Sequence, residues 1–116
     1  MRRALPTGRF EGLPTVTIGG LEVPVAVGFR ARLLGLAWLE RREAGPGLLI
    51  PRCRSVHTFG MRFALDVFFL DRDGDVLASR PAVPPRRLIW AQSGAVAVLE
   101  LAAAGGEIER DSTEGG

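Results

Sequence analysis

The chain has 116 residues, which is enough for one domain, and its 47% apolar content is typical of a globular protein. The formal net charge is only +2, and every basic residue is an arginine. Because acids are scattered between the arginines, we expect a solvated surface and do not expect nucleic acid as a partner.

Targeting signals are not visible in the sequence. Arg, Gly or Pro interrupts every apolar run before it reaches the roughly 20 residues of a membrane span. Two arginines stand near the N-terminus, but no apolar stretch of a signal peptide follows them. The single cysteine, Cys53, cannot form an internal disulfide. These features predict a cytoplasmic protein.

The first elements in chain order are a loose segment, a hairpin and a helix. Residues 1–13 are polar and rich in Gly and Pro, whereas Thr15–Val27 carries two β-branched runs around Gly19-Gly20, which predicts a hairpin. Over residues 28–45 apolar residues recur every three or four positions, which predicts an amphipathic helix ending at Gly45-Pro46. Within it, Gly35 would let another backbone approach closely.

The rest of the chain predicts strands. A short buried strand is expected at "GLLIP", a hairpin at Leu65–Ser79 around Asp73-Gly74, a short strand before Trp90, and a last buried strand at Gly94–Leu101. We therefore predict an α+β domain over residues 14–105, with a disordered tail over 106–116. Its sheet would be mostly antiparallel, either curled or a partial β-barrel, with one main helix after the first hairpin.

Several motifs resemble the bacterial and archaeal family called domain of unknown function 192. The resemblance extends from Pro24 to Gly105 and is most specific at "VHTFGMRFALDVFFLDRDG", where Leu65-Asp66-Val67 occupies the family's Leu-Asp position. The run Arg32-x-x-Gly35-Leu36 matches the family's Arg-x-x-Gly-Leu helix, and Glu100 fits its Val-Leu-Glu-Leu strand.

The resemblance implies a small, strand-rich α+β fold and no established reaction. The chain departs from the family pattern at three places. His57 stands where many relatives carry Trp, Ala31 stands where an acid often precedes the arginine, and "EIERDSTEGG" replaces a Gly-Asp pair followed by another strand.

Cys53, His57 and Met61 fall at even spacing and suggest a metal site. They are the soft ligand set of copper. However, a blue-copper centre needs two histidines and structural zinc needs four ligands, and the chain has one His and one Cys. One face of a buried strand explains the spacing as well, so we predict no metal and no cofactor. The acids of Asp71–Val76 lack the frame of an EF-hand and are expected in a hairpin turn.

A Cys53–His57 nucleophile pair is an alternative, since Arg52 and Arg54 would favour a thiolate. Residues four apart on a strand are about 13 Å apart, which is too far for a hydrogen bond. An acid–base pair of His57 and Asp66 is the other catalytic hypothesis. The sequence lacks a complete catalytic set, so it favours binding over catalysis.

Polar residues in otherwise apolar elements suggest a ligand pocket. Asp66 precedes the most apolar strand and would be half-buried, with Arg32 or Arg62 as its ion-pair partner. That pair could be purely structural. Alternatively, the polar side chains converge on a cleft for a small anionic or zwitterionic ligand, or for a protein partner. The candidate pocket residues are Arg32, His57, Thr58, Arg62, Asp66 and Glu100.

Overall fold

The computed structural model describes residues 10–91 and 93–103. Within them, the elements in chain order are β1 (Thr15–Ile18), β2 (Leu21–Pro24), α1 (Phe29–Leu34), the 3-10 helix η2 (Arg41–Glu43), β3 (Leu48–Pro51), β4 (Ser55–His57), β5 (Leu65–Leu70), β6 (Val76–Val83), β7 (Leu88–Trp90) and β8 (Ala97–Ala102). None of the described helices is long and apolar enough to cross a membrane.

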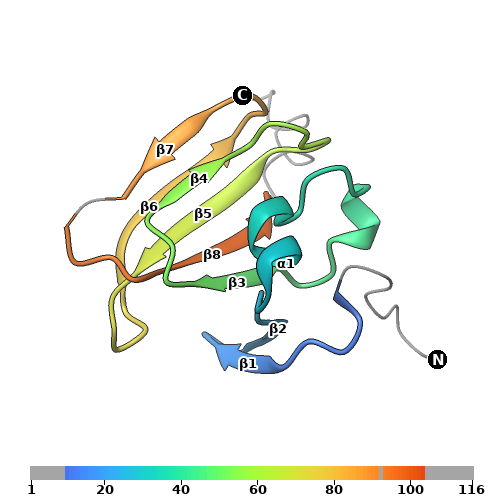
Figure 1. Cartoon of the computed structure of the whole chain (residues 1–116). Helices are drawn as coiled ribbons and strands as arrows, with labels where there is room; N and C mark the ends of the chain where they lie inside the picture. Colours follow the sequence, from blue (N-terminus) through green and yellow to red (C-terminus); the bar gives the residue numbers. More distant parts are fainter. Residues whose placement is uncertain (1–9, 92, 104–116) are drawn as a thin grey trace.

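A four-stranded sheet forms the centre of the molecule. Its strand order is β3-β8-β5-β6, and every neighbouring pair is antiparallel. Strands β1 and β2 form a separate hairpin, and β4 pairs with β7 in a second two-stranded sheet. Helix α1 lies over the sheet beside β3 and β8 (Figure 1).

Both predicted hairpins are confirmed. Gly19 and Gly20, with φ angles of 58° and 86°, connect β1 to β2, as expected for a tight turn that needs positive φ at both positions. Gly74, with φ of 86°, lies in the turn between β5 and β6. The predicted buried strands at "GLLIP" and near Glu100 are also present, as β3 and β8.

The predicted fold class is wrong. The described residues are mostly β, with no helix of seven residues or more and no closed barrel, so the fold is not an α+β structure with one main helix. The predicted helix over residues 28–45 is only the six-residue α1, followed by turns and η2.

Backbone geometry explains why the helix is short. Gly35 ends α1 with φ of 53° and ψ of −128°, which is far from helical values. Trp38 also has a positive φ, of 70°. The three- and four-residue spacing of apolar residues therefore continues through a non-helical turn, where Leu36 and Ala37 still point into the core.

Both faces of the central sheet are covered. On one face, Leu65, Val67 and Phe69 of β5 belong to the main core, together with Leu48, Ile50 and Val98. On the other face, Leu70 and Leu99 pack with Val23 of the first hairpin. Because successive side chains of a strand point to opposite faces, the strands contribute to one apolar cluster on each face of the sheet.

The chain ends are described in part. Phe10 belongs to the predicted loose segment 1–13, which is described only from this residue on, and its side chain packs into the main core. The predicted disordered tail, 106–116, lies outside the described residues.

Candidate functional site

Strand register places Glu100 inside the core. On β8, Glu100 lies between Leu48 of β3 and Val67 of β5, and both of these neighbours are completely buried. Residues opposite one another in an antiparallel pair point to the same face of the sheet. Glu100 therefore points to the main-core face, and it is only 4% exposed.

The turn after α1 covers the Glu100 carboxyl group. A methyl group added at Gly35 would lie 3.0 Å from Glu100 Oε1, and the backbone N–H of Leu36 donates a hydrogen bond to the carboxyl group. Oε1 has no hydrogen-bond partner among the described residues. Burial raises the pKa of Glu100 to about 7, although the hydrogen bond from Leu36 opposes the shift.

We expect Gly35→Ala to destabilise the protein by about 1–3 kcal/mol, because its φ and ψ favour glycine and its new methyl group would press on Glu100. Gly74→Ala is the matched control, since Gly74 also has a positive φ but open space around it. Denaturant unfolding of both variants measures the effect. Equal losses in the two variants would contradict a steric contact at Glu100.

A cavity of about 40 Å³ lies beside Glu100. Its lining comes from the end of α1 and the turn that follows, from β3, β4 and the segment between them, from a later loop residue, and from β8. The lining residues are Arg32, Leu34, Gly35, Leu36, Ile50, Cys53, Ser55, Val56, His57, Met61 and Glu100. One water molecule needs a cavity volume of roughly 10–15 Å³, so this cavity has room for about three water-sized groups.

Arg32 and His57 belong to the partly exposed part of the cavity wall. The Arg32 guanidinium donates from Nη1 to the Pro51 carbonyl and from Nη2 to the Arg52 carbonyl, the latter at 3.1 Å. These bonds fasten α1 to the end of β3. The His57 ring lies 6.0 Å from the ring of Phe59, between ring centroids, so the cavity wall adjoins an aromatic side chain that is 52% exposed.

The Cys53 thiol lines the same cavity and is half-buried. It donates a hydrogen bond to the Ser55 carbonyl at 3.0 Å. Burial raises the pKa of this thiol and the Glu100 charge raises it further, whereas the Ser55 backbone and Arg32 act in the opposite direction without reversing the shift. The thiol is therefore disfavoured as a thiolate nucleophile.

Cys53 should react with iodoacetamide near neutral pH more slowly than a free cysteine does, because only thiolate is alkylated and burial keeps the thiol protonated. Mass spectrometry of the intact protein would follow the reaction, with the same chain in denaturant as the reference. Alkylation faster than that of the unfolded chain would restore the hypothesis of a Cys53–His57 nucleophile pair.

The other three predicted pocket residues lie outside the cavity lining. Thr58 is buried, where its hydroxyl donates to the Pro84 carbonyl and accepts from the backbone N–H of Arg87, both at 2.8 Å. These two bonds hold the loop before β7 against the end of β4. Thr58 thus has a structural role in this fold.

The ion pair expected for Asp66 does not form. Asp66 Oδ1 instead accepts a hydrogen bond from the backbone N–H of Ala82 at 2.8 Å, beside a register shift between β5 and β6. Arg62 pairs with Glu40 at 2.7 Å on the surface. Asp66 does not line the cavity that His57 lines, so the structure gives no support for an acid–base pair of these two residues.

The even spacing of Cys53, His57 and Met61 has a different basis from the one expected. Strand β4 contains only Ser55–His57, so the three residues do not follow one strand face, yet all three line the cavity. Ser55, which also lines it, had no distinguishing signal in the sequence. Ser55 can be identified as a lining residue only once the packing of β4 against α1 is known.

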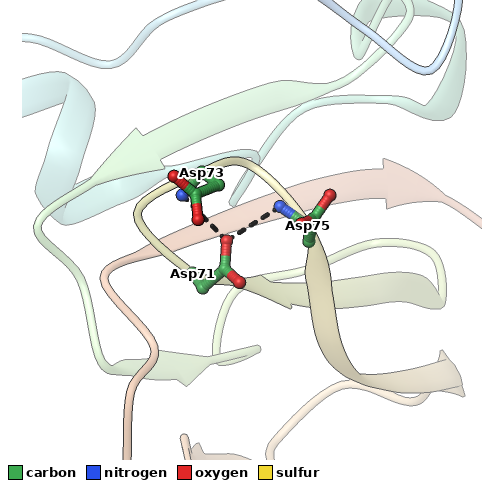
Figure 2. A group of neighbouring side chains, drawn as sticks. All are labelled: Asp71, Asp73 and Asp75. Atoms are coloured by element: carbon green, nitrogen blue, oxygen red, sulfur yellow. Dashed lines mark hydrogen bonds between the residues drawn. The ribbon is translucent and has the colours of Figure 1, made fainter.

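The turn between β5 and β6 gathers three carboxylates. Asp71 Oδ1 accepts hydrogen bonds from the backbone N–H groups of Asp73 and Asp75, at 2.8 and 3.0 Å (Figure 2). Among the described residues, these aspartates are the group of His, Cys, Asp and Glu whose ligand atoms all lie within 4.8 Å of one another. The hydrogen bonds of Asp71 fit the predicted turn, and exposed acids are common in such turns.

A second depression, of about 550 Å³, lies around η2 and is lined by Glu40, Arg41, Arg42 and Gly45. Glu40 is already paired with Arg62, and Arg41 donates to the Ala103 carbonyl at 2.6 Å. Two of its three charged side chains are thus engaged by the protein itself, and Arg42 is exposed, so the cavity at Glu100, with its buried carboxyl group, is the stronger candidate.

Comparisons with known proteins identify the family of the chain and two similar crystal structures. The family DUF192, described as "Uncharacterized ACR", matches residues 14–116. A crystal structure of a protein of unknown function from Novosphingobium aromaticivorans is similar, with a TM-score of 0.58 and 16% identity, covering 91% of this chain and 94% of that one. A putative transcription regulator from Sinorhizobium meliloti is 26% identical, with a TM-score of 0.61, covering 83% and 81%. No protein of curated function matched.

Proposed function

The chain belongs to the DUF192 family, and we propose that it is a binding domain whose cavity at Glu100 receives the polar end of a small ligand. One observation carries the proposal. The carboxyl group of Glu100 is buried, and its Oε1 has no hydrogen-bond partner among the described residues. A buried polar atom without a partner costs about 1–3 kcal/mol, and a ligand that donates to it would remove that cost.

The chemistry of the cavity supports binding over catalysis. In the Cys53–His57 pair, burial raises the pKa of the thiol. In the His57–Asp66 pair, only His57 lines the cavity, and Asp66 accepts a hydrogen bond from Ala82 beside a register shift between β5 and β6. The wall still offers one acid, one guanidinium, one imidazole, one hydroxyl and one thiol. Such a small set of convergent polar groups is typical of a ligand site.

The size of the cavity limits what can enter. With room for about three water-sized groups, it can take only the polar end of a ligand. Outside it, Phe59 adjoins His57, and the Trp38 ring covers Gly60, the residue after Phe59. Trp38 and Phe59 are 60% and 52% exposed, so an apolar part of the ligand would lie on these two rings.

A fragment screen followed by backbone NMR tests the proposal. We expect binding fragments to shift the amide signals of Gly35, Leu36, Ser55 and His57, and we expect Glu100→Gln to weaken these fragments. Glu22→Gln is the matched control, because Glu22 is an exposed carboxylate on the first hairpin.

Two results would overturn the proposed function. In the first, no fragment shifts the signals of the cavity residues. In the second, the fragments that bind shift only signals on another surface and bind Glu100→Gln as well as the parent protein.

A further inference from the structure

We propose that the ligand carries an α-amino acid head group, with its ammonium group on Glu100, its carboxylate at Arg32 and its side chain on the exposed rings of Trp38 and Phe59. The inference rests on the proposed function and names the class of ligand. Neither the family description nor the two similar structures assigns a ligand.

At the buried end of the cavity, Glu100 Oε1 lacks, among the described residues, a hydrogen-bond donor that the ligand could supply. Glu100 Oε1 points to the side of the sheet covered by α1, with Leu48 and Val67 on the neighbouring strands, and these two apolar residues can donate nothing from their side chains. A carboxylate in such surroundings is stabilised by a cation. An ammonium group supplies both a positive charge and three donors.

At the partly exposed wall of the cavity, the positive charge of Arg32 favours an anionic group of the ligand. Arg32 donates to two backbone carbonyls, and no carboxylate of the described residues pairs with it. A guanidinium carries five N–H donors, so three remain beyond the two already engaged, and these would donate to the ligand carboxylate. One acid and one guanidinium in a single wall match a zwitterion, whereas a simple anion would leave Glu100 without its donor.

The dimensions agree with this assignment. About three water-sized groups correspond to an ammonium group, the adjoining carbon and part of a carboxylate. The amino acid side chain must then lie outside the cavity. The aromatic ring of Phe59 adjoins the cavity at His57, which favours an apolar or aromatic side chain there.

Three probes with the same phenyl ring test the two charged groups separately. Phenylalanine carries both the ammonium and the carboxylate, phenethylamine carries only the ammonium, and 3-phenylpropionate carries only the carboxylate. We expect phenylalanine to bind most tightly, phenethylamine less tightly and 3-phenylpropionate weakest, as measured by titration calorimetry or NMR. Glu100→Gln should weaken phenylalanine by about tenfold or more, because it removes a charge-assisted hydrogen bond. Glu22→Gln should not.

The pH dependence is a second readout. The ammonium group requires Glu100 to be ionised, so phenylalanine affinity should rise by about tenfold between about pH 6 and about pH 8. The charged and titratable groups that share the cavity with Glu100 are Arg32 from α1, Cys53 after β3 and His57 from β4. The same titration with Glu100→Gln measures their contribution, and the rise should be absent there.

Several outcomes would overturn the inference, and they are distinct from failure of the proposed function. If 3-phenylpropionate binds as tightly as phenylalanine, the cavity binds a ligand of another class. If phenylalanine binds Glu100→Gln equally well, the ammonium group does not contact Glu100. If none of the three binds at millimolar concentration, the amino acid class is wrong, while the fragment screen still decides whether the cavity binds ligands.

Discussion

The free energy of unfolding should fall as the pH rises from about 4.5 to about 7, and the fall should disappear in Glu100→Gln. The folded protein holds the Glu100 proton up to about pH 7, whereas the unfolded chain releases it near its ordinary pKa of 4.5. Below about pH 4.5 both states are protonated, so the full stability is present. Between the two pKa values the unfolded state gains by ionising, and above about pH 7 the loss levels off.

The size of this effect follows from the two pKa values. Their separation corresponds to a loss of about 3 kcal/mol, which is a large part of the 5–15 kcal/mol that stabilises a typical domain. Denaturant unfolding at about pH 5, 6, 7 and 8 measures it. The comparison with Glu100→Gln isolates one group, because the other carboxylates titrate in both proteins.

The control for this prediction is Glu22→Gln, whose pH dependence should match that of the parent protein, since this carboxylate is exposed. A parallel pH dependence of Glu100→Gln and the parent protein would show that Glu100 titrates normally in the folded state. That result would contradict both the burial of the Glu100 carboxyl group and the proposed role of Oε1 in ligand binding.

Phe69→Ala should destabilise the protein by about 3–5 kcal/mol, the loss typical of truncating a buried aromatic residue. Phe69 is 1% exposed, it lies on the central strand β5, and its side chain belongs to the main core with Val67 and Val98. Its removal would leave a cavity beneath the strand that carries Glu100. Thermal or denaturant unfolding gives the loss.

Phe59→Ala is the matched control for this prediction, because it makes the same chemical change at a ring that is 52% exposed. Its unfolding free energy should change by no more than about 0.5 kcal/mol. If the proposed function is correct, Phe59→Ala should instead weaken the aromatic probes. Similar losses of stability in the two variants would contradict the burial that separates these phenylalanines.

Local chemistry made the two hairpins predictable. Gly19-Gly20 and Asp73-Gly74 can adopt the turn geometry without help from distant parts of the chain, and the β-branched runs on either side pair with their sequence neighbours. The length of α1 was not predictable in the same way. The apolar spacing after Gly35 is helical, but its backbone is not, since Leu36 reaches the core through a turn.

The candidate site was predictable only in part. Arg32, His57 and Glu100 were expected to share a polar pocket, and all three line the cavity. Whether they bind a ligand stays a prediction. Thr58, Arg62 and Asp66 were expected with them but bind other parts of the protein. A polar side chain can pair with whichever donor or acceptor the fold brings near, and sequence distance does not specify that partner.

The sequence by itself determined the hairpin turns, the buried strands and the family to which the chain belongs. Only the tertiary structure decided that Glu100 is buried and that no residue of the described part of the chain forms a hydrogen bond with its Oε1. That result depends on β8 lying between β3 and β5 in one register, since a shift of one residue would turn Glu100 to the opposite face. The pairing joins segments far apart in the chain, so no local pattern could specify it.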